Sequence, residues 1–201
     1  MRVIGLTGGV GSGKSLAAQM LQEACGAKLL IADDLGHIVM EPGTEGFIQI
    51  RNRFGGEVVK PDGTIDRAWL ADRIFGDAQA RQDLNAIIHP QVIRYIKNYI
   101  QERKQQPGII ILESAILFES GCDTLCDEIW YVHVSAQTRK KRLAEDRGYS
   151  EAKAQAIMQQ QMADEAFYSR CDVIIENNGT KQELKKNIQD KINERKIQET
   201  L

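Results

Sequence analysis

A glycine-rich stretch near the amino terminus constrains the fold of this 201-residue chain more than any other feature. Residues 5–15 read GLTGGVGSGKS, and residues 8–15 fit the pattern G-x-x-x-x-G-K-[ST]. A β-branched run at 2–6 precedes this pattern, and apolar residues at helical spacing follow it at 15–24. In a strand–loop–helix unit of this kind, the glycines let backbone N–H groups turn toward an anion at a helix N-terminus. We therefore expect the chain to hold the phosphates of a nucleoside triphosphate.

The residues of this loop have different expected tasks. Lys14 is expected to reach the β- and γ-phosphates, and the Ser15 hydroxyl is expected to ligate magnesium. The remaining nucleotide contacts are expected from Gly9, Val10, Gly11, Ser12, Gly13 and Leu16.

Apolar runs after the loop predict four further strands, at 28–33, 108–115, 128–134 and 172–177. Helical patterns separate these runs. Uninterrupted apolar strands of this kind indicate a parallel sheet that is covered by helices on both faces. The expected core is therefore a doubly wound α/β domain with a five-stranded parallel sheet.

Two helical stretches are larger than the core requires. Residues 34–107 contain no convincing core strand and predict a helical subdomain. Residues from about 138 to 170 are polar and helical, and they begin with the basic run TRKKR. We expect this second stretch to form a lid, so that 1–201 is a single domain with two insertions. The tail at 181–201 predicts an amphipathic helix that packs on the core.

Composition narrows the classes of partner. The 26 Lys and Arg residues nearly balance the 28 Asp and Glu residues, which gives a formal net charge of −2 and disfavours nucleic acid or a membrane surface as a partner. The four cysteines are too scattered for a disulfide scaffold. No signal peptide is evident, and no apolar stretch approaches the ~18 residues of a membrane span. The expected protein is cytoplasmic and either a monomer or a weak homo-oligomer.

Three classes of protein use such a loop, and the rest of the chain favours one of them. A GTPase needs an N-K-x-D guanine reader, which the sequence lacks; NNGTK at 177–181 does not fit. A motor or ATPase needs a hydrolytic acid and an apparatus that couples hydrolysis to a partner, and a chain of 201 residues is small for that. A small-molecule kinase needs a substrate-holding subdomain and a cationic lid, which 34–107 and 138–147 supply.

The basic run at the start of the lid has a second interpretation as a solvated helix face. Arg139, Lys140 and Lys141 are expected to be solvated, whereas Arg142 is expected to meet phosphate. Arg142 and Arg147 lie about one and a half turns apart on a helix, so both need not point inward.

Further motifs follow the loop in a fixed order: IADDLGHIVMEPGTEG (31–46), FGGEVVKPDGTIDRAWL (54–70), LNAIIHPQV (84–92), ILFESG (116–121) and DVIIENNG (172–179). Together they resemble the dephospho-coenzyme A kinase family over nearly the whole chain. The resemblance implies ATP-dependent phosphorylation of the ribose 3′-hydroxyl of dephospho-CoA, with ATP and Mg²⁺ as cofactors. It also implies a nucleoside-kinase-like core with a helical CoA-binding domain and a lid.

The resemblance implies roles for residues outside the loop as well. Asp33 matches the family's catalytic aspartate, at the end of a predicted strand, where open parallel sheets bind ligands. Glu113 is expected either to hold magnesium through water or to be a surface acid. His89 matches a substrate-domain motif, although a structural place at a helix start fits it better than catalysis. The other implied contacts are Arg67 for the substrate or the core helices, and Asn177 and Asn178 for the nucleotide.

The sequence departs from the family pattern in the lid, where the usual Arg-Asp pair reads Asp146-Arg147, and after the loop, where Leu16 replaces a threonine. These departures leave the lid contacts open. The alternative functions are a kinase for another nucleoside or sugar alcohol and a nucleotide-binding regulatory module without turnover. The intact acid at Asp33 disfavours the regulatory module.

Overall fold

The computed structural model describes residues 1–197, which fall into two compact units. The core unit comprises residues 1–30 together with the chain from Lys104 onward, and the helical unit comprises Ile31–Arg103. Residues 198–201, the end of the predicted tail helix, lie outside the described part of the chain.

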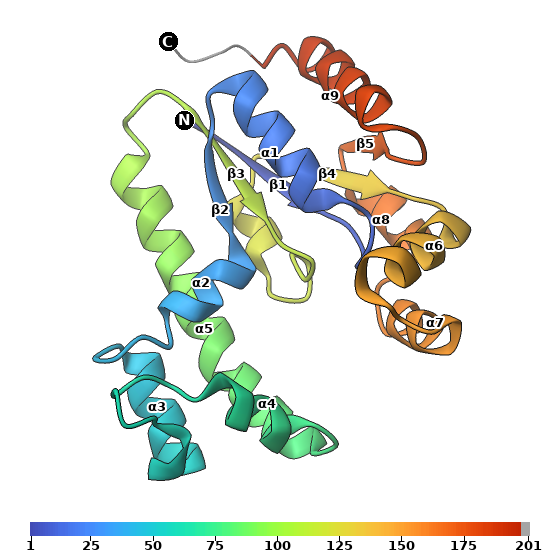
Figure 1. The fold of residues 1–201 in the computed structure, drawn as a ribbon. Coiled ribbons are helices and arrows are strands. Elements are labelled where there is room, and N and C mark those ends of the chain that lie inside the picture. Colours follow the sequence, from blue (N-terminus) through green and yellow to red (C-terminus); the bar gives the residue numbers. More distant parts are fainter. Residues whose placement is uncertain (198–201) are drawn as a thin grey trace. The chain divides into compact units, whose positions relative to one another are not determined.

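The core unit is built on a five-stranded sheet with the strand order β2-β3-β1-β4-β5 (Figure 1). β1 pairs in parallel with both β3 and β4, and β4 pairs in parallel with β5, so the predicted parallel sheet is confirmed. The register places Leu6 opposite Glu113 and Thr7 opposite Tyr131. The strands are β1 (Arg2–Thr7), β2 (Lys28–Ile31), β3 (Ile109–Glu113), β4 (Glu128–His133) and β5 (Val173–Glu176).

Two helices share the main apolar cluster with this sheet, α1 (Lys14–Cys25) and α9 (Lys181–Glu194). α9 buries Leu184, Ile188 and Ile192, which recur every four residues and so lie on one face of the helix. A capping box at Thr180 and Glu183 starts this helix. The predicted amphipathic tail helix is therefore confirmed over 181–194.

The segment from 136 to 170 forms three short helices in the core unit, α6 (Ala136–Arg147), α7 (Glu151–Gln159) and α8 (Asp164–Arg170). Ser135 and Ser150 begin α6 and α7, because each hydroxyl accepts a hydrogen bond from a backbone N–H of the first turn. The Phe167 ring of α8 stacks on Tyr131 of β4 with the ring centroids 4.4 Å apart. The third helix of the expected lid is thus packed on the sheet.

The helical unit has its own apolar core. One cluster of its buried side chains comprises Ile50, Val58, Ile65, Leu70 and Leu84. Thr44 and Asp66 cap two of the helices by accepting backbone N–H groups. The elements are α2 (Ala32–Ile38), α3 (Glu45–Phe54), a 3₁₀ turn (Gly56–Val58), α4 (Arg67–Ile74) and α5 (Ala78–Arg103).

Helix α5 corrects one expectation, because residues 78–103 form a single helix with Pro90 inside it. A proline inside a helix removes one backbone hydrogen bond, and its ring clashes with the carbonyl of the preceding turn. Leu84 before it and Val92 and Ile96 after it are all buried, so packing on both sides outweighs that loss. His89 is therefore in the middle of a helix, and its expected place at a helix start is wrong.

No helix of residues 1–197 is long and apolar enough to cross a membrane.

Candidate active site

The glycine-rich loop joins β1 to α1 and presents an open helix N-terminus. Gly11 and Gly13 both have φ of 81°, in the left-handed region that glycine adopts without strain. No side chain caps α1 at Gly13. The first N–H groups of a helix have no partner within it, and the helix dipole is positive at this end. The start of α1 is therefore built to receive an anion.

Three side chains converge beside this helix start. Lys14 Nζ lies 3.6 Å from Glu113 Oε1, and the Ser15 hydroxyl donates a 3.2 Å hydrogen bond to Glu113 Oε2. Glu113 ends β3, next to β1 in the sheet, and only 3% of its surface is exposed. The alternative that Glu113 is a surface acid is therefore wrong.

The pair of Ser15 and Glu113 fits a magnesium ion by its chemistry. Both supply hard oxygen atoms, and Mg²⁺ is commonly held by one or two protein oxygens together with substrate phosphates and water. Across residues 1–197 no group of three His, Cys, Asp or Glu side chains is placed to hold a metal by itself. A magnesium ion at this site would thus take its remaining ligands from bound phosphates and water.

Arg139 contradicts the expectation that it is solvated, because only 6% of it is exposed. Its Nε donates to the Val10 carbonyl oxygen at 3.2 Å. α6 places Arg139 and Leu143 on the same face, one turn apart, and both are buried against the loop. In the sequence, this buried face is indicated by residues spaced three and four apart, namely Arg139, Arg142 and Leu143. The exposed Lys141 lies off this face.

A second contact chain joins the loop to the end of β5. Arg142 Nη2 donates to the Asn177 carbonyl oxygen at 2.9 Å, and Asn177 Nδ2 donates to the Ser12 carbonyl oxygen at 2.7 Å. Asn178 Oδ1 accepts the Ser135 N–H at 2.8 Å. Both asparagines therefore support the loop and α6, and their contact with a nucleotide base stays a prediction. Arg147 is exposed at the end of α6.

Asp33 belongs to the helical unit. β2 ends at Ile31, two residues earlier than predicted, because α2 begins at Ala32. Asp33 and Asp34 consequently lie in the first turn of α2, where the helix dipole favours negative charge, and both are exposed.

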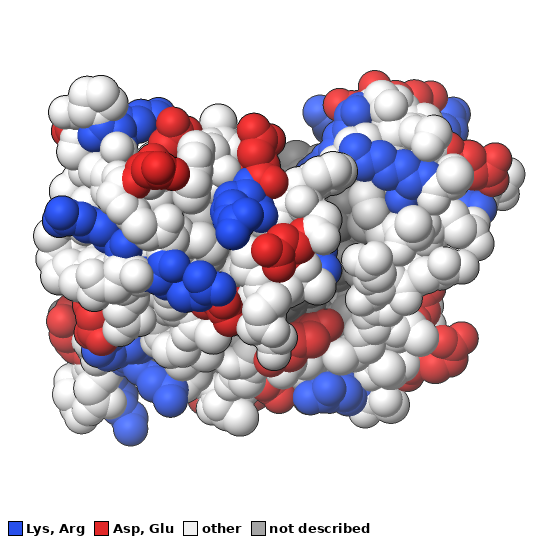
Figure 2. Space-filling view, turned by 90° about the horizontal axis from the view of Figure 1, so that it is seen from below, with Lys and Arg blue, Asp and Glu red and all other residues white. Residues whose placement is uncertain are grey.

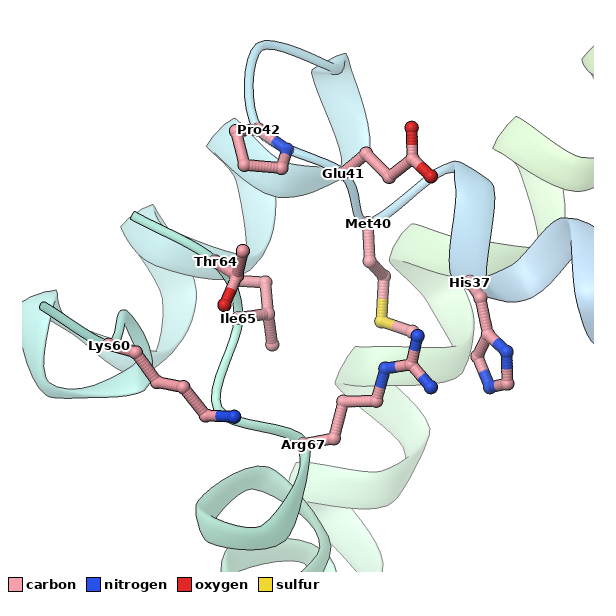
Figure 3. A pocket seen from close by; sticks show the side chains of 8 residues that line it. All are labelled: His37, Met40, Glu41, Pro42, Lys60, Thr64, Ile65 and Arg67. Carbon is pink, nitrogen blue, oxygen red and sulfur yellow. The ribbon is translucent and has the colours of Figure 1, made fainter. Parts of the chain in front are cut away.

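The helical unit contains a pocket of about 470 Å³ that holds one of the predicted substrate residues, Arg67. Arg67 is the first residue of α4, and its guanidinium extends toward Met40 and His37 in Figure 3. Lys60 brings a second cation from the loop before α4. The full lining is His37, Met40, Glu41, Pro42, Lys60, Thr64, Ile65 and Arg67.

His89 is not part of this lining. Burial lowers the pKa of the half-buried His89 imidazole, so its neutral form is favoured at neutral pH.

On the face seen in Figure 2, blue and red side chains are interspersed, in keeping with the nearly balanced charge of the chain.

Comparison with known proteins decides the family. Residues 2–183 match the dephospho-CoA kinase family. The chain belongs to this family. A dephospho-CoA kinase of Syntrophotalea carbinolica is 39% identical over 181 residues, which cover 90% of this chain and 85% of that protein. A dephospho-CoA kinase of Symbiobacterium thermophilum is 40% identical over 181 residues, covering 90% of this chain and 75% of that protein.

Solved structures agree on the fold of this dephospho-CoA kinase family member. TT1252 from Thermus thermophilus superposes with a TM-score of 0.75 at 27% identity and covers 96% of this chain and 97% of its own. Dephospho-CoA kinase from Campylobacter jejuni gives a TM-score of 0.73 at 22% identity, covering 97% of this chain and 98% of its own.

Proposed function

We propose that this protein transfers the γ-phosphoryl group of ATP to the ribose 3′-hydroxyl of dephospho-CoA. Family membership supports the substrate pair. The observation that carries the proposal is the convergence of Lys14, Ser15 and Glu113 at the uncapped start of α1. A cytoplasmic location and a monomeric or weakly oligomeric state remain part of the proposal.

Phosphoryl transfer proceeds through a loose transition state in most analyses, so catalysis is mainly positioning and neutralisation of charge. In the proposed site, the loop N–H groups and Lys14 bind the phosphate chain. Ser15 and Glu113 would hold magnesium, which supplies further neutralisation of phosphate charge when it is bound. Helices α6–α8 would form a lid that excludes water as a competing acceptor.

We infer that the acceptor is held by the helical unit. Lys60 and Arg67 offer two cations for the diphosphate of dephospho-CoA, since paired N–H donors match phosphate oxygens. Met40 and Ile65 offer apolar contacts for its pantetheine arm. Asp33 would orient the 3′-hydroxyl and receive its proton.

The test is ATP consumption measured side by side with dephospho-CoA, adenosine and simple sugars, with the phosphorylated position of the product determined by NMR. Phosphate on the ribose 3′-oxygen of dephospho-CoA is the expected product. Turnover with adenosine or a sugar in preference to dephospho-CoA would replace the proposed acceptor. ATP binding without turnover on any acceptor would favour a regulatory module.

Arg67→Ala is expected to raise KM for dephospho-CoA by about 10- to 100-fold, the value of a charged hydrogen bond, with little change in kcat. Arg73→Ala is the matched control, because Arg73 lies on the same helix but does not line the pocket. Steady-state kinetics and calorimetric titration with dephospho-CoA measure both variants. Equal KM values for the two variants would remove the pocket from the acceptor site.

Arg142→Ala is expected to lower turnover more than Arg147→Ala. Arg142 lies beside the loop through its bond to Asn177, whereas Arg147 is exposed at the end of α6. Steady-state rates at saturating ATP and dephospho-CoA compare the two variants. The reverse order would show that the Asp146-Arg147 inversion has transferred the phosphate contact to Arg147.

A further inference from the structure

Arg139 is a buried cation without a carboxylate partner. Although only 6% of it is exposed, no Asp or Glu oxygen of the described chain lies within ion-pair distance of its guanidinium. Burial lowers the pKa of Arg139, and Tyr131 and Asp164 oppose that shift. An arginine nonetheless stays protonated in a protein. Holding an unpaired charge out of water is costly, so this position calls for a compensating anion.

The guanidinium is held directly against the glycine-rich loop. A Cβ added to Gly9 would lie 2.2 Å from Arg139 Nη2 and 2.5 Å from Cζ, so any larger residue at Gly9 would displace the guanidinium. Its contacts there are the Val10 carbonyl oxygen and Gln161 Oε1. Gln161 Oε1 also accepts the Val10 N–H at 3.2 Å. The neutral amide oxygen of Gln161, in the segment after α7, therefore accepts hydrogen bonds from both the Arg139 guanidinium and the loop.

We propose that Arg139 binds the terminal phosphoryl group of ATP, and that Gln161 keeps it in place until the nucleotide arrives. This inference rests on the proposed function. The loop N–H groups and Lys14 bind the phosphate chain, with Lys14 reaching the β- and γ-phosphates, and a cation on the α6 side would add a second positive charge for the terminal group. A phosphate oxygen is a much stronger acceptor than an amide oxygen, so Arg139 exchanges Gln161 for phosphate when ATP binds.

The competing interpretation is that Arg139 only holds the shape of the loop. The two interpretations differ in their dependence on the terminal phosphate. A contact with that group strengthens ATP binding but not ADP binding, and it contributes most where charge develops during transfer. A purely structural contact supports both nucleotides alike.

The experiment measures kcat and the Kd values for ATP and ADP in Arg139→Gln, Gln161→Glu and the parent protein. Arg139→Gln is expected to lower kcat by at least about 10²-fold, since arginines at a transferred phosphoryl group contribute ~10³–10⁵. It is also expected to raise the Kd for ATP by about tenfold or more relative to the Kd for ADP. Gln161→Glu leaves Arg139 in place but pairs it with a carboxylate. It should therefore also lower kcat and weaken the binding of ATP relative to that of ADP.

Lys141→Gln is the matched control, because it removes the same charge from a side chain of α6 that is 74% exposed. It should change kcat by less than about twofold, as surface charges commonly do. Melting temperatures report whether each variant is folded, and Gln161→Glu carries the test if Arg139→Gln does not fold.

An equal loss of ATP and ADP affinity with kcat unchanged would overturn the proposal and leave Arg139 as a support of the loop. Parent-like kinetics in both variants would overturn it as well. The comparison of ATP with ADP needs no acceptor. It therefore tests Arg139 even if dephospho-CoA proves not to be the substrate.

Discussion

Replacing Lys14 with alanine is expected to lower kcat for phosphorylation of dephospho-CoA by at least about 10³-fold, the upper range for loss of one charge-stabilising donor. The reason is that the ammonium reaches the phosphates from the first residue of α1, where backbone N–H groups alone cannot supply a full positive charge. Steady-state rates and a direct ATP titration measure the effect.

The variant is also expected to be less stable than the parent protein. Glu113 is 3% exposed, and the Lys14 ammonium lies beside it, at 3.6 Å. Loss of that cation leaves a buried carboxylate with less compensation, at a cost of about 1–3 kcal/mol. Thermal unfolding should show this cost, and adding Glu113→Gln to Lys14→Ala should restore much of it without restoring turnover.

The double variant separates chemistry from folding. If Lys14→Ala with Glu113→Gln melts like the parent and is far less active than Glu113→Gln alone, Lys14 acts on the phosphates. A Lys14→Ala protein that phosphorylates dephospho-CoA at close to the parental rate would show that the loop does not bind the reacting nucleotide.

Asp33→Asn is expected to lower turnover by at least ~10²-fold while the affinity for ATP changes little. Loss of a positioned general base typically costs ~10²–10⁴ in rate, or about 3–5 kcal/mol in the barrier. Asparagine keeps the size of the side chain and its place in the first turn of α2 but cannot accept the proton of the 3′-hydroxyl. Because proton transfer can be late in a loose transition state, orientation of the hydroxyl contributes to the loss.

Asp34→Asn provides a close control for this prediction. Asp34 is the next residue, lies in the same helical turn, and is also exposed, so the change removes an equal charge from the same helix end. Its turnover should stay within about threefold of the parent, since a surface charge contributes little. Similar losses in both variants would point to the charge of the turn rather than to a base at Asp33. Failure of Asp33→Asn to bind ATP would make Asp33 a metal or structural residue.

Much of the architecture follows from local patterns in the sequence. The run of glycines before Lys14 needs a strand before it and a helix after it, and both are present as β1 and α1. The later apolar runs each became a strand, because continuous apolar residues are stable only when both faces of a strand are covered. A strand is shorter than predicted where a helix begins early. The strand predicted at 28–33 ends at Ile31, because α2 begins at Ala32.

Helix α5 shows the limit of local patterns. In the sequence, Pro90 predicts a break between two helices. The helix continues because Leu84, Val92 and Ile96 are buried on either side of Pro90. The gain from burying these side chains exceeds the cost of the proline, which is one lost hydrogen bond and the clash of its ring with the preceding turn. That comparison depends on neighbours that are distant in the chain.

The sequence by itself determined the glycine-rich loop, the strands of the sheet and the positions of Lys14 and Ser15, because each depends on residues that are close together in the chain. Only the tertiary structure decided that Glu113 is buried beside Lys14 and that Arg139 is held on Gly9 and Val10. These residues lie about a hundred positions or more from the loop in sequence. Their burial and their partners depend on how the strands and helices assemble, which no local pattern contains.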